Sequence, residues 1–188
     1  MCVTLENVSR VYEGRRVLDG VSLTLPRRGA VCFFGPSGCG KTTILRLICG
    51  LDKPDAGKVI IPPGTRFACH FQEDRLLPWY TARENLTLVM PEKEANRLLA
   101  ATRLEDAADR FPDELSGGMR RRLSLARALG YPSDVLVLDE PLRELDEATA
   151  DAMLELIRQA ARDRLLILVT HDRAQAEALG CDIHDFPL

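Results

Sequence analysis

The pattern of apolar and polar residues predicts an α/β chain in which buried strands alternate with amphipathic helices. Three apolar runs lack the polar alternation of a half-exposed strand, as is typical of strands covered on both faces in a parallel sheet. These runs cover residues 30–34, 135–138 and 165–169. Helical spacing of apolar residues recurs between and after them. The helical segments cover residues 44–48, 116–129, 147–161 and 172–179.

Shorter strands are predicted around this parallel sheet. Residues 1–29 alternate apolar and polar positions in short segments separated by Gly14 and Gly20, which predicts an N-terminal antiparallel β edge. Two short strands, 59–61 and 67–71, follow the first helical segment. A last edge strand is expected at 183–186.

Residues 73–115 have a different character, with scattered charges, three prolines and helical spacing at 95–101. We interpret this stretch as a helical insert rather than part of the sheet. The sequence therefore predicts a single domain, residues 1–188. Its catalytic core comprises residues 1–72 and 130–188, and residues 73–129 form a helical subdomain.

Composition narrows the class of protein. A chain of 188 residues, 46% hydrophobic and 28% charged, has the profile of one globular domain. A net charge of −3 gives no basic footprint and argues against a nucleic-acid partner. Neither a membrane-spanning run nor a signal peptide is recognisable, so we expect a cytoplasmic protein. The six scattered cysteines are expected to be reduced thiols rather than zinc ligands or disulfides.

The segment 35–42 reads G-x-x-x-x-G-K-T and stands between a predicted strand and a predicted helix, as a phosphate-binding loop requires. Its glycines let successive N–H groups surround a phosphate, and the helix N-terminus adds positive potential. Lys41 would neutralise the β- and γ-phosphates and Thr42 would ligate Mg²⁺. A plain glycine-rich turn would not explain the Lys-Thr pair. The candidate nucleotide-binding residues are Gly35, Pro36, Ser37, Gly38, Cys39, Gly40, Lys41, Thr42 and Thr43.

Polar residues also follow the other two buried strands. Asp139 and Glu140 come directly after the strand 135–138, and His171 follows the strand 165–169. The carboxyl ends of parallel strands form the ligand-binding edge of an open sheet. Asp139 is suited to Mg²⁺, and Glu140 to polarising a water for attack on the γ-phosphate. The alternative reading, an acidic turn that caps the next helix, is weakened by the phosphate loop.

The segment LSGGM at 115–119 resembles the signature motif of the ATP-binding cassette (ABC) ATPases and lies in that family's order. Tyr12, Gln72, Asp146 and His171 stand where the family has its base-stacking aromatic, Q-loop glutamine, D-loop aspartate and switch histidine. The resemblance covers essentially the whole chain. It implies a P-loop NTPase fold, with a RecA-like parallel sheet core, the antiparallel edge and a short helical subdomain.

The resemblance also implies a mechanism shared between two chains. Ser116, Gly117 and Gly118 would contact ATP bound to a second ABC ATPase subunit, placed head to tail. The implied catalytic residues are Glu140 as general base, His171 and Gln72. The implied Mg²⁺ ligands are Thr42, Gln72 and Asp139.

The segment 71–79 resembles importers of the nitrate, sulfonate and taurine group. This implies an ATP-hydrolysing subunit that energises uptake of a small solute. Its partners would be transmembrane permease subunits and a solute-binding protein, and it would lie on the inner face of the cell membrane. Leu76, Leu77, Trp79 and Tyr80 are candidate permease contacts. Two alternatives stay open: a soluble ABC ATPase without a transport role, and a nucleotide-dependent regulatory module with weak hydrolysis.

Two departures from the family pattern bear on hydrolysis. Met119 replaces the usual glutamine of the signature motif. Arg143 and Glu144 stand before Asp146 where the family usually has Ser-Ala. Two long charged side chains there require a rearranged contact between the subunits. They leave open whether the second subunit is an identical copy.

We predict that Lys41→Ala weakens nucleotide binding itself, because the variant loses the cation that neutralises the phosphates. Isothermal calorimetry with ATP measures the loss directly. Undiminished ATP binding would contradict the assignment of the phosphate loop.

Overall fold

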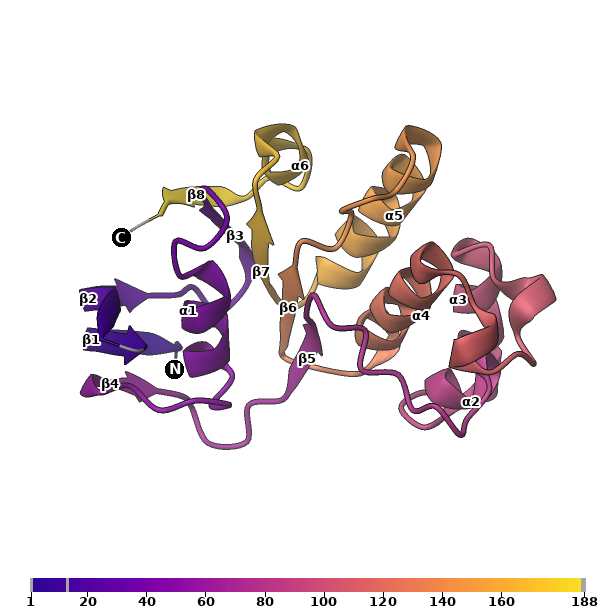
Figure 1. Cartoon of the computed structure of the whole chain (residues 1–188), viewed down its shortest axis with the longest axis horizontal. Coiled ribbons are helices and arrows are strands. Elements are labelled where there is room, and N and C mark those ends of the chain that lie inside the picture. Colours follow the sequence, from indigo (N-terminus) through magenta and orange to yellow (C-terminus); the bar gives the residue numbers. More distant parts are fainter. Residues whose placement is uncertain (1, 13, 187–188) are drawn as a thin grey trace.

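A five-stranded parallel sheet forms the centre of the molecule, in the order β5-β6-β7-β3-β8 (Figure 1). The computed structural model describes residues 2–12 and 14–186. The strands of this sheet are β3 (Gly29–Phe34), β5 (Phe67–His70), β6 (Val135–Asp139), β7 (Leu165–Thr170) and β8 (Asp182–Asp185). The predicted α/β class and the parallel sheet are confirmed.

The helices pack around the sheet and to one side of it (Figure 1). They are α1 (Lys41–Ile48), α2 (Ala82–Thr87), α3 (Glu92–Ala101), α4 (Gly117–Gly130), α5 (Glu147–Ala161) and α6 (Arg173–Ala178), with short 3₁₀ turns η1 (Glu105–Ala107) and η2 (Pro112–Glu114). The side chain of Ser116 caps α4 and that of Asp146 caps α5, so both helices begin where a polar cap replaces the missing backbone partner.

Opposite faces of the parallel sheet bury different side chains. On β6, Val137 belongs to a core shared with α1 and the antiparallel sheet, whereas Leu136 and Leu138 belong to a core shared with α4 and α5. Every residue of β6 and β7 is buried. Because both faces are covered, these strands require apolar side chains at successive positions, which explains the continuous runs in the sequence.

The N-terminal antiparallel sheet has the order β2-β1-β4. It contains β1 (Thr4–Tyr12), β2 (Arg15–Thr24) and β4 (Ala56–Ile60). The prediction of two segments on either side of Gly20 was wrong, because β2 runs through that glycine. Gly20 adopts a φ of 65°, and its N–H donates to the Ser9 hydroxyl at 2.9 Å. A β-bulge therefore accommodates the residue without ending the strand.

The helical part has a core of its own, built from α2, α3, η1 and part of α4. In α4, Leu123 packs into this core and Leu125 into the core against the sheet, so the helix joins the two parts. The separate core supports our division of the chain at residues 73 and 129, which remains a proposal. Within the described residues, no helix is both long and apolar enough to cross a bilayer.

The sequence pattern missed one helix in this part. Thr81 caps the start of α2: its hydroxyl accepts from the Glu84 N–H, while the Glu84 carboxylate accepts from the Thr81 N–H. This reciprocal capping box fixes the start of a helix of only 6 residues. So short a helix does not show a helical period in the sequence, although the Thr-x-x-Glu spacing was a usable signal.

A buried arginine joins the ends of two helices at the base of the sheet. The Arg164 guanidinium donates to the carbonyl oxygens of Ala160 (2.6 Å), Tyr131 (2.9 Å) and Leu129 (2.6 Å), and to the Ser133 hydroxyl (2.9 Å). These carbonyls lie at or just beyond the C-termini of α4 and α5, where helices leave backbone oxygens unpaired. Burial lowers the Arg164 pKa from its ordinary value.

We predict that Arg164→Ala lowers the free energy of unfolding by about 2–3 kcal/mol, because four charge-assisted hydrogen bonds are lost and buried carbonyls are left unpaired. Chemical denaturation measures the change. Arg162→Ala is the matched control, since Arg162 lies two residues away and is exposed. A loss equal to that of the control would contradict the structural role.

Candidate functional site

A cavity of about 210 Å³ opens at the carboxyl edge of the parallel sheet, around the start of α1. Residues from segments far apart in the sequence line it, including most of the predicted phosphate loop. The polar lining residues are Ser37, Lys41, Thr42, Thr43, Gln72, Asp139 and Glu140. The structure thus brings the predicted phosphate loop, the predicted Q-loop glutamine and the predicted acidic pair to one place.

The phosphate loop is held tightly over this cavity. Gly40 has a φ of 110°, and a Cβ on it would lie 2.7 Å from a Val17 methyl group, so only glycine fits. Lys41 is buried, and its ammonium group donates to the carbonyl oxygens of Gly35 (2.7 Å) and Pro36 (2.6 Å). Within the described chain, no side chain caps the start of α1. Its first N–H groups are therefore free to bind an anion.

Thr42 and Asp139 together offer oxygen ligands for a divalent cation. The Thr42 hydroxyl donates to one carboxylate oxygen of Asp139 at 2.7 Å. The other oxygen, Oδ1, is buried and finds no hydrogen-bond partner in the part of the chain that the structure describes. Burial raises the Asp139 pKa above its usual range. An orphaned carboxylate oxygen beside a hydroxyl fits Mg²⁺, which is bound through few protein oxygens together with phosphates and water.

Glu140 is positioned by an unusual backbone conformation and by His171. Its φ is 51°, a left-handed conformation that costs about 1 kcal/mol in a residue with a Cβ. The Glu140 N–H donates to the Val169 carbonyl at 2.9 Å, which holds this turn against β7. His171 Nδ1 lies 2.8 Å from one oxygen of the buried Glu140 carboxylate. Because a carboxylate only accepts, Nδ1 carries the hydrogen in this pair.

Such strain is found most often at functional positions. A carboxylate that is oriented by a histidine and faces a cavity lined by the predicted phosphate loop has the arrangement of a general base. Glu140 and His171 both follow buried strands whose carboxyl ends share one edge, so the sequence predicted that they lie near each other although 31 residues separate them; the structure adds the direct contact.

The predicted signature residues lie outside this cavity. The Ser116 hydroxyl accepts from the Met119 N–H at 3.3 Å and so caps α4, and Gly117 and Gly118 are exposed. None of the three lines the cavity. Their predicted contact with nucleotide therefore concerns the nucleotide of another chain, and it stays a prediction.

Tyr12 also lies apart from the cavity lining, at the end of β1. Its ring faces the Arg10 guanidinium at 4.7 Å, and its hydroxyl donates to Asp52 at 3.1 Å. The side chain remains 38% exposed, so a face is available for a base. Stacking of Tyr12 on a nucleotide base stays a prediction.

The cavity has two apolar lining residues that the sequence did not suggest. Val17 of β2 packs against Gly40, and Val169 lies at the end of β7. Neither residue belongs to a sequence motif. An apolar residue in a strand is ordinarily interpreted as a core residue, so the sequence offered no reason to assign either one to the site. Only their position at the cavity reveals them.

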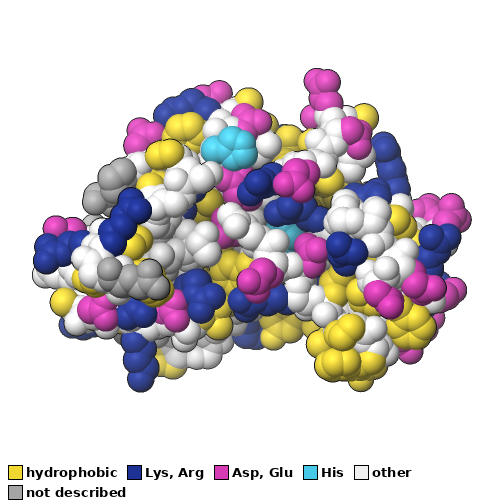
Figure 2. Space-filling view, in the orientation of Figure 1, with side chains coloured by type: hydrophobic (Ala, Val, Ile, Leu, Met, Phe, Trp, Pro, Cys, Tyr) yellow, Lys and Arg dark blue, Asp and Glu magenta, His cyan; other side chains and the backbone are white. Residues whose placement is uncertain are grey.

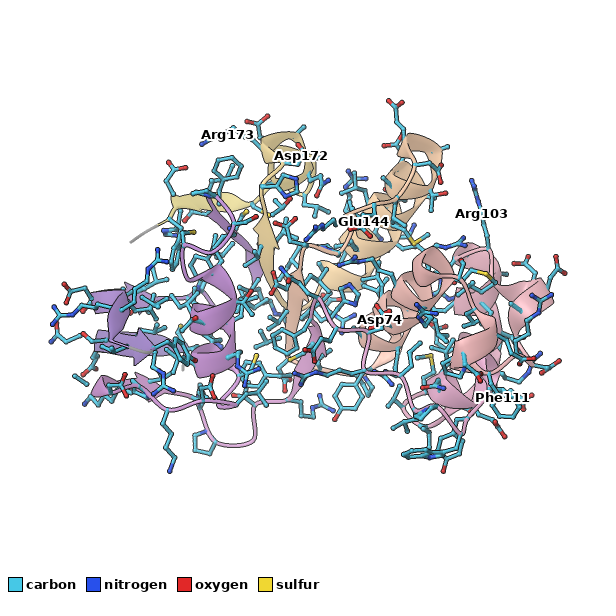
Figure 3. All side chains as sticks on the ribbon, in the orientation of Figure 1. Asp74, Arg103, Phe111, Glu144, Asp172 and Arg173 are labelled. Atoms are coloured by element: carbon cyan, nitrogen blue, oxygen red, sulfur yellow. The ribbon has the colours of Figure 1, made fainter. Side chains whose placement is uncertain are left out.

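The charged pair before Asp146 forms an exposed ion pair. The Arg143 guanidinium lies 3.3 Å from the Glu144 carboxylate, and Glu144 has a φ of 64°. Glu144 lies beside α5 (Figure 3). The two long side chains thus pair with each other on the surface, close in the chain to Glu140.

Comparison with known proteins places this geometry in context. Residues 18–143 match the ABC transporter family. The aliphatic sulfonates import ATP-binding protein SsuB 1 of Rhizobium johnstonii is 38% identical, with 95% of this chain and 70% of the relative covered. A protein of the same name from Shouchella clausii is 39% identical, covering 96% and 75%. The bicarbonate transport ATP-binding protein CmpD of Synechocystis is 36% identical, covering 93% and 70%.

Solved structures give the same result. The ATP-binding cassette MJ0796, in a dimeric post-hydrolysis state bound to ADP and Pi, superposes with a TM-score of 0.85 at 30% sequence identity. The alignment covers 94% of this chain and 90% of that one. A second dimeric structure of MJ0796 gives a TM-score of 0.79 at 28% identity.

We predict that Asp139→Asn raises the free energy of unfolding by about 1 kcal/mol when nucleotide and Mg²⁺ are left out, because a buried charge with an unpaired oxygen is removed. Burial raises the pKa of Asp139 in the folded state. Above that pKa the carboxylate is ionised, and its full destabilising effect on the fold is present. The variant's advantage should shrink as the pH falls from the raised pKa towards the ordinary aspartate pKa.

Thermal unfolding across that pH range measures the effect. Asp134→Asn is a control of opposite sign, because hydrogen bonds from Arg66 lower the Asp134 pKa. A loss of stability in Asp139→Asn at neutral pH would contradict the destabilising role of the buried carboxylate.

Proposed function

Since the chain belongs to the ABC transporter family, we propose that it is the ATP-hydrolysing subunit of an importer for a small anionic solute. The observation that carries this proposal is that four side chains line the same cavity: Lys41, Thr42, Asp139 and Glu140. These groups supply phosphate binding, oxygen ligands and a base. Together they match the needs of nucleoside triphosphate hydrolysis.

The residues divide the chemistry between them. The loop N–H groups and Lys41 bind the phosphates, and the ammonium group exchanges its carbonyl partners for phosphate oxygens as ATP enters. Mg²⁺, held by Thr42 and Asp139 with Gln72 nearby, would neutralise charge on the transferred phosphoryl group. Glu140 accepts a proton from the attacking water, and His171 holds the carboxylate in place.

A second cassette completes the site in this proposal. The Ser116 segment is exposed at the start of α4 and outside its own chain's cavity, and the N-terminus of this helix favours an anion. In a head-to-tail pair, Ser116, Gly117 and Gly118 would cover the γ-phosphate bound by the other subunit. The similar MJ0796 structures are dimeric, which supports this arrangement.

Permease subunits would dock on the helical part, with the chain held peripherally at the cytoplasmic face of the membrane. Hydrophobic side chains gather over the region of α2 (Figure 2). Trp79 is 69% exposed, and Leu88 and Phe111 are also exposed. Exposed apolar groups of this size are common at protein interfaces. Relatives named for sulfonate and bicarbonate import support an anionic solute, and a solute-binding protein would deliver it.

A regulatory module with weak hydrolysis is the second candidate function. The exposed Arg143–Glu144 ion pair favours it, because those side chains stand three and four residues after the proposed base. Desolvating such a pair against a second subunit is costly. Steady-state ATPase activity in the assembled complex separates this function from that of the importer.

The proposal predicts that Glu140→Gln still binds ATP and loses about 10²-fold or more in turnover, as expected when a positioned base is removed. Calorimetry measures binding and phosphate release measures turnover. Glu177→Gln is the matched control, since Glu177 is exposed on α6 and lies outside the cavity. Turnover of Glu140→Gln near that of the unmodified chain would refute the role of the base.

The transport role needs a cellular test. The chain, co-expressed with the permease and solute-binding subunits of a sulfonate importer, should restore growth on a sulfonate as sole sulfur source to a host lacking its own sulfonate ATPase subunit. Glu140→Gln should not restore it. If growth fails while the purified complex hydrolyses ATP, the ATPase assignment stands and the sulfonate assignment falls.

A further inference from the structure

Two thiols from different elements lie in direct contact beside α1. Cys49 is the C-terminal cap residue of α1 and Cys69 is the third residue of β5. Their sulfur atoms are 3.5 Å apart. Both side chains are partly exposed, and both pack against the core between α1 and the parallel sheet. The phosphate-site chemistry described above uses neither residue.

The contact makes the two thiols unequal. The hydrogen bond between the two thiols lowers the Cys69 pKa below the ordinary thiol value, and the positive charge of Arg75 acts in the same direction. The same hydrogen bond, followed by burial, raises the Cys49 pKa. Cys69 is therefore the thiol that ionises first and reacts as the nucleophile, and Cys49 is the thiol that resolves the product.

We propose that Cys49 and Cys69 form a peroxide-reactive site that closes to a reversible disulfide. The Cys69 thiolate attacks one oxygen of hydrogen peroxide, the O–O bond breaks, and the departing hydroxide takes a proton to become water. Cys69 is then a sulfenic acid. The Cys49 sulfur attacks the Cys69 sulfur, forming the S–S bond, and the expelled hydroxide leaves as water with the Cys49 proton. The two thiols are oxidised by two electrons, and the peroxide is reduced to water.

Two of the other cysteines are less reactive. Burial raises the pKa of Cys32 to about 12 and that of Cys181 to about 11, which keeps both thiols protonated and slow to react. A disulfide between Cys49 and Cys69 would also affect the proposed nucleotide site. It would tie the end of the helix that starts at Lys41 to the strand that leads to Gln72. The inference does not depend on the proposed importer function.

Peptide mapping tests the site in the intact chain. The protein is treated with a small excess of hydrogen peroxide, alkylated and digested with trypsin without reductant. Because Lys53 precedes proline, Cys49 lies in peptide 47–58 and Cys69 in peptide 67–75, and neither contains a second cysteine. We expect these two peptides to be cross-linked, in protein that runs as a monomer on a non-reducing gel. Dithiothreitol should release them.

Single variants test the order of the steps. In Cys49→Ser the sulfenic acid has no resolving thiol, so dimedone should label Cys69. In Cys69→Ser, dimedone should not label Cys49. Cys181→Ser should cross-link like the unmodified chain. Circular dichroism checks that each variant folds. Oxidation confined to Cys39 or Cys181, or a link between peptides 47–58 and 67–75 that forms only after denaturation, would overturn the proposal.

Discussion

The hydrogen bond between Thr42 and Asp139 is the interaction on which the site depends, because it joins the start of α1 to the end of β6 across 97 residues. Both ends are fixed by burial rather than by local turns. Asp139 is fully buried at the end of a strand covered on both faces, and α1 packs its apolar side against the same sheet. The sheet therefore acts as a rigid base that sets the separation of the phosphate loop and the carboxylates.

The site carries unfavourable features that the rest of the fold offsets. Asp139 has a buried oxygen without a partner in the described chain, Glu140 has a left-handed backbone conformation, and the Lys41 ammonium is buried against carbonyls. Each feature lowers the free energy of unfolding of the chain. In our proposal, the phosphates and the cation would compensate the buried charges of Lys41 and Asp139, which is the logic of a preorganised binding site.

The helical part carries the second half of the composite site that we propose. Helix α4 packs against the sheet at Leu125 and into the helical core at Leu123, so its N-terminus is held at a fixed distance from the parallel sheet. Because Ser116 lies there, outside its own chain's cavity, the chain presents the two halves of our proposed composite site on separate surfaces. A partner subunit would bring complementary halves together.

The sequence by itself determined the order of the elements and most of the chemistry. Apolar runs, glycine spacing and capping residues are local patterns, and they placed the parallel strands, α4, α5, the phosphate loop and the acidic pair. Tertiary structure decided contacts between distant residues that no sequence pattern suggested: Cys49 with Cys69, and Arg164 with the ends of two helices. It also decided that β2 continues through Gly20 and that Arg10 lies over Tyr12. Such contacts depend on strand order and on which side chains face one another after packing, and no periodicity within a single segment encodes either.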